Sequence, residues 1–209
     1  MVNFVLASAS TGRFGTLTRA GVTPRVMVSD VDEDAVIADL ERERGPLSAT
    51  EVAQVLARAK CLAVADSLPR SDPADVVLGC DSVLEFDGEV HGKPHTPEIA
   101  RARWRAIRGS SGVLHSGHYL VRRTAHGLRD SSGVASTTVH FADLSNAEID
   151  SYVATGEPLH VAGGFTVDGL GGPYITGIEG DYHAVVGVSL PLLRNLLHQL
   201  DLQWHDLLP

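Results

Sequence analysis

The sequence predicts an α/β protein with a mixed, strongly twisted sheet flanked by helices. Strand-like and helix-like segments alternate over the first half of the chain, and two long β-rich segments follow each other in the middle. No linker, internal repeat or low-complexity stretch divides the chain. We therefore expect residues 1–209 to form a single domain, with two lobes that share one sheet.

The first part of the chain predicts two short strands around a helix. Residues 3–7 and 25–28 have the apolar character of short strands, whereas residues 13–20 carry apolar side chains at helical spacing. The serine-rich residues 8–12 predict a loop between the first strand and the helix. Residues 29–34, of sequence Ser-Asp-Val-Asp-Glu-Asp, predict an acidic loop after the second strand.

Local signals place the remaining elements. Two Ser-x-x-Glu patterns are typical of capping boxes, and a Thr-Pro pair is typical of a helix start. Together with apolar spacing, they predict helices over residues 48–67, 97–108, 145–155 and 187–200. Period-two patterns and an Asp-Gly turn predict strands over residues 75–80, 113–124 and 133–141 and a hairpin over residues 82–91. Residues 162–180 form a glycine-rich segment.

Composition excludes several classes of protein. The chain is 44% hydrophobic and 21% charged, as is ordinary for a globular protein, and its net charge of −9 disfavours a nucleic-acid surface. No apolar stretch approaches the roughly 20 residues that span a bilayer, and the apolar run at residues 4–7 is too short for a signal peptide. We expect a cytoplasmic protein without nucleic-acid or membrane partners. Cys61 and Cys80 lack metal-type spacing and are expected to be reduced core thiols.

An acid followed by a returning cation is the most informative pattern in the chain. The apolar run Val76-Val77-Leu78-Gly79-Cys80 leads to Asp81, and Lys93 follows in Gly92-Lys93-Pro94. Strands of α/β enzymes that stop at an Asp present acid-base groups at a cleft. Taken alone, the pattern fits a second interpretation equally well. In that interpretation Asp81 ends a strand in a turn, and Lys93 is a solvated loop residue.

A second pattern joins the first predicted strand to the first helix. Ser8, Ser10 and Arg13 form Ser-x-Ser-x-x-Arg, in which loop amides, two hydroxyls and a guanidinium could hold phosphate. The alternative is a serine-rich turn with a helix cap and a surface arginine.

Further charged residues are weaker signals. Asp32-Glu33 could ligate Mg²⁺ or form a solvated acidic loop. Lys60 lies in a mostly apolar helix and could equally extend its amine to solvent from the flank.

The joint order of these motifs resembles the Maf family of nucleotide pyrophosphatases. The matching order is Ser-x-Ser-x-x-Arg, Asp-Glu, Leu-Ala-x-x-Lys, Cys-Asp-Ser, Gly-Lys-Pro and Ala-Gly-Gly-Phe-x-x-Asp-Gly, and the resemblance extends from Leu6 to Leu197. It implies an elongated, mixed sheet with a deep cleft between two lobes, of the Maf/ITPase-like kind. It also implies a homodimer, a nucleoside triphosphate substrate and a divalent cation, with Mg²⁺ favoured over Mn²⁺ or Co²⁺.

The resemblance also implies roles for individual residues. Ser8, Ser10 and Arg13 would hold phosphates, and Lys60 and Lys93 would contact the triphosphate from two sides. Glu33 and Asp81 would hold the metal, and Asp81 would be the general base. These roles suit cleavage between the α and β phosphates, which requires charge neutralisation and an oriented, partly deprotonated water.

The chain departs from the family pattern at three positions. Gly12 stands where the family usually has the first arginine of Ser-Pro-Arg-Arg, and loss of that cation should weaken phosphate binding by about 1 kcal/mol. Ser82 and Asp168 stand where pyrimidine-hydrolysing members have Thr and Gln. An ionised Asp168 can only accept hydrogen bonds, so bases with adjacent N–H donors, such as guanine or its modified forms, become better candidates. Asp168 could alternatively cap a turn at Gly169.

Two other functions remain open. Proteins resembling this family have been linked to inhibition of septum formation, so the alternative is a nucleotide-binding regulator of cell division with little turnover. A generic phosphate-ester hydrolase would release orthophosphate instead of pyrophosphate.

Overall fold

The computed structural model describes residues 2–72 and 74–209 and confirms an α/β fold with one mixed sheet. Within these residues the sheet has seven strands, which pair in the order β2-β1-β3-β5-β6-β7, with β4 paired to β3. They are β1 Phe4–Leu6, β2 Arg25–Val26, β3 Val76–Phe86, β4 Glu89–His91, β5 Ser111–Thr124, β6 Gly127–Phe141 and β7 Ile175–Glu179. The strand β1 is parallel to β2 and β3, and all other pairs are antiparallel.

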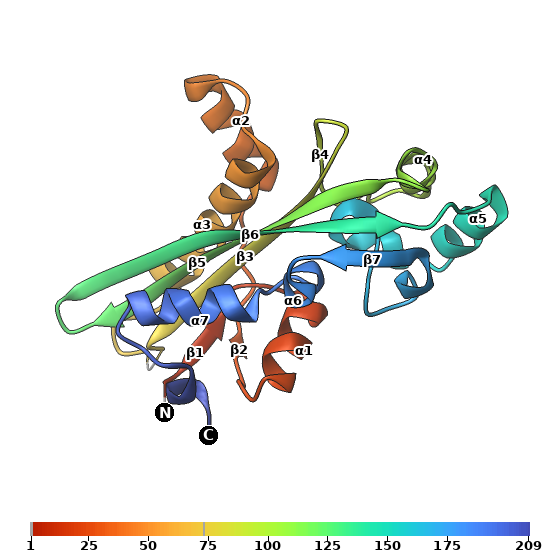
Figure 1. Ribbon diagram of the computed structural model, residues 1–209. Coiled ribbons are helices and arrows are strands. Elements are labelled where there is room, and N and C mark those ends of the chain that lie inside the picture. Colours follow the sequence, from red (N-terminus) through yellow and green to blue (C-terminus); the bar gives the residue numbers. More distant parts are fainter. Residues whose placement is uncertain (1, 73) are drawn as a thin grey trace.

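Helices lie on both faces of the sheet and at one end (Figure 1). The α-helices are α1 Thr11–Arg19, α2 Glu33–Arg44, α3 Ala49–Ser67, α4 Pro97–Ile107, α5 Asn146–Ala154, α6 Tyr182–Val186 and α7 Leu190–Gln199. Short 3₁₀ helices are η1 Glu157–His160, η2 Ala162–Gly164, η3 Gly172–Tyr174 and η4 Trp204–Leu207. None of the helices in the described part of the chain is long and apolar enough to cross a bilayer.

Side chains of β3 point alternately to the two faces of the sheet and pack into two separate hydrophobic cores. Leu78 and Cys80 pack with Leu17 of α1 and with α7, whereas Val77 packs with the helix α3 on the opposite face. Asp81 follows Val77 and Gly79 on the α3 face because side chains two apart in a strand share a face. The hydrophobic pattern of β3 therefore determines that Asp81 lies beneath α3.

Two glycines allow the backbone of α3 to approach the sheet closely. A Cβ on Gly79 would lie 2.2 Å from the carbonyl oxygen of Ala57, and one on Gly117 of β5 would lie 2.2 Å from that of Ala53. Gly117 pairs with Asp81 in the register of β3 and β5. The absence of both side chains therefore sets the height of α3 directly above the acid.

Among residues 2–72 and 74–209, no strand pairs with the middle of β3 on one of its sides. Pairing with β1 ends at Leu78, and pairing with β4 begins at Leu84. Between them, β3 pairs with β5 on its other side, so Asp81 lies at a local opening in the sheet edge. The strand does not stop at Asp81 as the sequence pattern predicted, because residues beyond it continue to pair with β5 and β4.

A separate aromatic core supports the opposite end of the sheet. Trp104 of α4 makes edge contacts with Phe141 at 5.7 Å and with Tyr152 of α5 at 5.5 Å between ring centroids. Its indole nitrogen donates to the carbonyl of Gly164 at 2.8 Å. This contact ties the glycine-rich segment to α4.

A buried histidine connects β5 to the start of α7. The Nδ1 of His118 donates to the carbonyl of Ser116, and its Nε2 accepts from the backbone N–H of Ser189 at 2.9 Å. Burial lowers the pKa of His118 to about 4. The neutral ring therefore serves as a structural connection at neutral pH.

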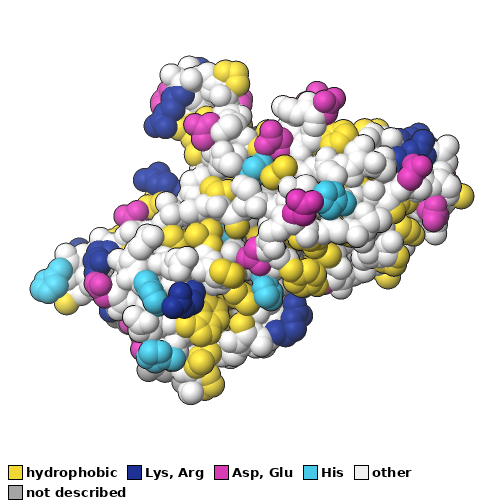
Figure 2. All heavy atoms as spheres, viewed as in Figure 1, with side chains coloured by type: hydrophobic (Ala, Val, Ile, Leu, Met, Phe, Trp, Pro, Cys, Tyr) yellow, Lys and Arg dark blue, Asp and Glu magenta, His cyan; other side chains and the backbone are white. Residues whose placement is uncertain are grey.

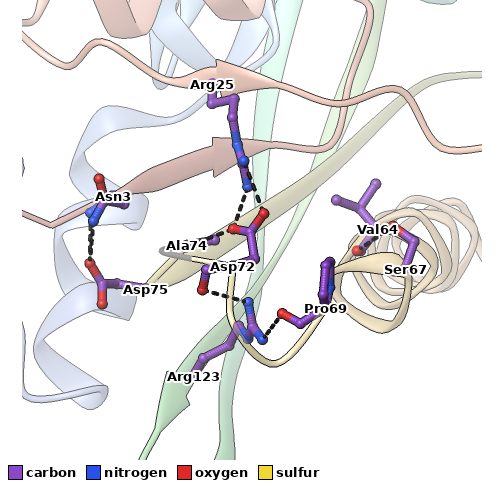
Figure 3. A network of polar contacts seen from close by, with 9 residues as sticks. All are labelled: Asn3, Arg25, Val64, Ser67, Pro69, Asp72, Ala74, Asp75 and Arg123. Atoms are coloured by element: carbon purple, nitrogen blue, oxygen red, sulfur yellow. Dashed lines mark hydrogen bonds and ion pairs between the residues drawn. The ribbon is translucent and has the colours of Figure 1, made fainter.

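Polar contacts join the chain segments at the outer end of β1 and β3 (Figure 3). Arg25 forms two hydrogen bonds with the carboxylate of Asp72, at 2.7 and 3.0 Å, and Arg123 donates to the backbone carbonyls of Pro69 and Asp72. Asn3 donates to Asp75. These bonds hold residues 69, 72 and 75, which lie between α3 and β3, against Asn3, Arg25 and Arg123.

Several predicted boundaries were wrong for local reasons. Residues 29–34 are not entirely loop, because the Asp32 side chain accepts from Ala35 N–H and starts α2 at Glu33. The predicted helix over residues 187–200 starts later than expected: Gly187, whose φ is 129°, ends the preceding helix α6, and Ser189 caps α7, which starts at Leu190. Strand β2 is shorter than predicted, β6 begins earlier, and the glycine-rich segment contains 3₁₀ turns and β7.

On the face shown in Figure 2, basic side chains lie in small groups between acidic ones. The two cysteines are buried free thiols, and burial raises the pKa of each to about 12.

Gly117→Ala should destabilise the protein by about 1–3 kcal/mol, because the added methyl group must displace the α3 backbone. Urea unfolding measures the change. Gly92→Ala is the matched control, since a Cβ there meets no described atom within 4 Å. Equal stabilities of the two variants would show that α3 does not depend on the close approach.

Candidate functional site

A cavity of about 650 Å³ lies at the opening beside β3. Its walls come from segments far apart in the chain: the β1–α1 loop, α3, β3, the Lys93 loop, residues 157–169 and the end of α6. All nine residues expected from the sequence to form the site line it, namely Ser8, Ser10, Arg13, Glu33, Lys60, Asp81, Ser82, Lys93 and Asp168.

Lys60 lies between two carboxylates. Its Nζ is 2.5 Å from Oδ1 of Asp81 and 2.8 Å from Oε1 of Glu33. The Lys60 and Asp81 side chains are 10% and 9% exposed, whereas Glu33 is 40% exposed. Lys60 is therefore a paired, buried cation and does not extend into solvent.

The pKa values of the two carboxylates beside Lys60 shift in opposite directions. Burial raises the pKa of Asp81 above its ordinary value, although the charges of Lys60 and Arg13 oppose the shift. Burial also raises the pKa of Glu33, but its hydrogen bond to Lys60 and the nearby cations outweigh this, so its pKa lies below the ordinary value. The pKa of the buried Asp81 is thus raised and that of the more exposed Glu33 is lowered.

Arg13 is fixed by three acceptors. It donates to Ser8 Oγ at 2.9 Å, to Ser82 Oγ at 3.3 Å and to the carbonyl of Gly187 at 3.2 Å. Ser82 in turn hydrogen-bonds Ser116 at 2.8 Å. Ser82 therefore orients the guanidinium, a role that the sequence did not indicate.

The start of α1 lies beside Arg13. The Ser10 side chain caps the helix by accepting from the backbone N–H of Arg13 at 3.3 Å. The helix-cap interpretation of Ser10 is thus correct, and the same residue also lines the cavity. A Cβ on Gly12 would lie 3.1 Å from the carbonyl oxygen of Val186. The end of α6 therefore packs closely against Gly12, which has no side chain.

Lys93 lies on an exposed loop at the cavity. Hydrogen bonds to the neighbouring Gly92, one of them from α4, hold this loop in place. Arg103 donates to the carbonyl of Gly92 at 2.6 Å, and the backbone N–H of Gly163 donates to the same carbonyl at 3.1 Å. Arg103 was absent from the sequence-based site because its helical spacing resembles that of any surface arginine.

Asp168 lies on the wall formed by residues 157–169 and is exposed. Its carboxylate makes no hydrogen bond to any residue in the ranges 2–72 and 74–209, so it does not cap the turn at Gly169 in the described structure. Glu157 bonds the loop instead. Sequence reasoning missed Glu157, whose one signal was an acid beside Pro158 before the glycine-rich segment.

Glu33 and Asp81 are the two cavity carboxylates that Lys60 holds side by side, and they could hold a metal. No group of three or more His, Cys, Asp or Glu side chains suited to a metal occurs among the residues described. Two carboxylates beside a cavity fit Mg²⁺, which commonly takes one or two protein carboxylates and completes its shell with phosphate oxygens and water.

Comparison with known proteins gives consistent matches. Residues 3–200 match the family model described as Maf-like protein. A protein of Leifsonia xyli is 50% identical over 97% of this chain and 94% of its own length. One of Salinispora tropica is 55% identical over 96% and 85%, and one of Mycolicibacterium gilvum is 51% identical over 97% and 96%. All three are named nucleoside triphosphate pyrophosphatase.

Lys60→Met should destabilise the protein by about 3–5 kcal/mol, because it leaves a buried carboxylate without its cation. Urea unfolding at neutral pH provides the measurement. The double variant Lys60→Met/Asp81→Asn removes both charges and should recover most of the loss. Failure of the second substitution to restore stability would show that the unpaired charge is not the cause.

Proposed function

This chain belongs to the Maf-like protein family, and on that premise we propose that it is a nucleoside triphosphate pyrophosphatase. The reaction would cleave a nucleoside or deoxynucleoside triphosphate, or a modified one, into the monophosphate and pyrophosphate. The observation that carries the proposal is Lys60 between Glu33 and Asp81, at a cavity that Arg13 and Lys93 also line. Cations beside a buried carboxylate suit the transfer of a highly charged group to water.

The phosphates would bind among the cations. Arg13 is held by Ser8, Ser82 and Gly187, so little side-chain entropy remains to be lost when it meets phosphate. Ser8 and Ser10 would contribute hydroxyl donors beside it. Lys60 and Lys93 would neutralise charge from the α3 and loop sides of the cavity.

Asp81 is the proposed general base. Burial makes its carboxylate more basic than that of free aspartate, while Lys60 favours the ionised form needed to accept a proton. The attacking water would lie between Asp81 and the phosphate, and Asp81 would orient it and take its proton. No covalent intermediate is required.

Glu33 and Asp81 would also hold a divalent cation, Mg²⁺ by preference, with Mn²⁺ or Co²⁺ as alternatives. When bound, the ion would neutralise phosphate charge and polarise the phosphoryl oxygens. Lys60 already bridges the same two carboxylates and would keep them close together.

The base would lie against the wall that carries Asp168. This acceptor is exposed and unbonded among the described residues, which favours a base with adjacent N–H donors. Guanine and its 7-methyl form are the proposed class.

A cytoplasmic homodimer is the proposed physiological form, without nucleic-acid or membrane partners. Sedimentation velocity distinguishes a dimer from the 22.2 kDa monomer.

Asp81→Asn should lower kcat by about 10²- to 10⁴-fold, because the amide cannot accept the proton from water. Pyrophosphate release in the presence of Mg²⁺ provides the measurement. Asp66→Asn, on an exposed part of α3, is the control and should retain activity. Orthophosphate as the product would contradict the proposed bond cleavage, and nucleotide affinity without turnover in the unmodified protein would favour the regulatory alternative.

GTP and 7-methyl-GTP should have kcat/KM values at least about tenfold above those of UTP and dTTP, because Asp168 can only accept hydrogen bonds. Asp168→Gln should narrow the difference, since glutamine offers both a donor and an acceptor. Turnover of UTP or dTTP far above that of GTP would disprove the assignment of the base.

A further inference from the structure

Glu157 holds together the loop that carries Asp168. Its Oε1 accepts from the Tyr152 hydroxyl at 2.9 Å, from the Thr166 hydroxyl at 2.5 Å and from the backbone N–H of Gly171 at 3.0 Å. Its Oε2 accepts from the backbone N–H of Leu170 at 3.0 Å. One carboxylate thus joins α5 to both ends of residues 166–171, here called the Asp168 loop.

The Asp168 loop is folded tightly around this carboxylate. A Cβ on Gly169 would lie 2.5 Å from Oε2 of Glu157, and one on Gly171 would lie 2.6 Å from both the Thr166 carbonyl oxygen and the Tyr152 hydroxyl oxygen. Both positions therefore lack space for a side chain. The conformation of the loop depends on the acceptor at its centre.

The charge of Glu157 is balanced by hydrogen bonds alone within the described chain. All four donors are neutral, and no ion pair joins Glu157 to a residue in the ranges 2–72 and 74–209. Burial raises the pKa of Glu157, but these hydrogen bonds outweigh it and the pKa lies below its ordinary value. The loop consequently favours an ionised acceptor, because the backbone N–H groups of Leu170 and Gly171 can only donate and would oppose the N–H₂ of a glutamine.

We propose that Glu157 is a positioning residue for nucleobase recognition, holding the Asp168 loop so that Asp168 can accept from adjacent N–H donors of a guanine-type base. The inference rests on the proposed function of the cavity. Asp168 is two residues from Thr166 and Leu170, both bonded to Glu157, and its own carboxylate is unbonded among the described residues. Both oxygens of Glu157 are bonded to the loop or to α5, three times on Oε1 and once on Oε2, so we assign it a role that acts through the loop.

The Arg13 and Lys60 part of the phosphate end is not bonded to this network, whereas the Lys93 loop is joined to the same region by the hydrogen bond from His95 N–H to the Leu159 carbonyl. Arg13 is fixed by Ser8, Ser82 and Gly187, and Lys60 by Glu33 and Asp81, none of which contacts Glu157 by a hydrogen bond. Disturbing Glu157 should therefore change recognition of the base and leave phosphate recognition by Arg13 and Lys60 intact. That separation provides the test.

Glu157→Gln should raise KM for GTP by about 10- to 100-fold while kcat changes much less, since the loss concerns binding of the base. The ratio of kcat/KM between GTP and UTP should move towards one. Inorganic tripolyphosphate, which has no base, should inhibit the variant and the unmodified protein equally. Tyr152→Phe removes one donor without changing the charge and should produce a smaller shift of the same kind.

Glu98→Gln, on the exposed surface of α4, is the matched control for the change from acid to amide. An unchanged GTP-to-UTP ratio in both Glu157→Gln and Tyr152→Phe would overturn the inference. So would weaker inhibition by tripolyphosphate in step with the rise in KM, because a general disturbance of the fold would be the cause. If the unmodified protein releases no pyrophosphate, the proposed function fails, and equilibrium binding of GTP and UTP to the same variants still tests Glu157.

Discussion

The close approach of α3 to the sheet at Gly79 and Gly117 is the constraint on which the site depends. It brings the helix backbone within contact of β3 and β5, and therefore brings Lys60 within 2.5 Å of Asp81. A side chain at either glycine would raise the helix and separate the two charges. The geometry of a charged site is thus set by two residues that carry no chemistry of their own.

The charged residues of the site are of two kinds, a buried pair and a set of more exposed groups. Lys60 and Asp81 are almost fully buried and compensate each other, whereas Glu33, Lys93 and Asp168 lie towards solvent. Pairing allows the buried acid to remain in an apolar sheet without the full cost of an isolated charge. Exposed charges do not need to be paired in this way. A ligand can therefore be recognised at these positions without destabilising the core.

Local patterns predicted most of the fold and located the cavity residues, but not their contacts. The capping boxes at Ser48 and Ser145 each involve residues only three positions apart. The sequence alone therefore predicts where these two helices start. The continuation of β3 past Asp81 depends on pairing with β5, which is a long-range property. The joint role of Ser82 and Arg13, the support of the Lys93 loop by Arg103 and the contacts of Glu157 likewise arise between distant segments, so no local pattern reveals them.

The opening in the sheet between Leu78 and Leu84 also bears on how the cavity exchanges its contents. A site closed by two paired strands would require backbone hydrogen bonds to break whenever a ligand entered or left. Here the strand that carries Asp81 pairs with β5 on one side from Val76 to Glu85, and its other side is open between Leu78 and Leu84 among the described residues. Ligand exchange at this opening therefore requires no separation of paired strands.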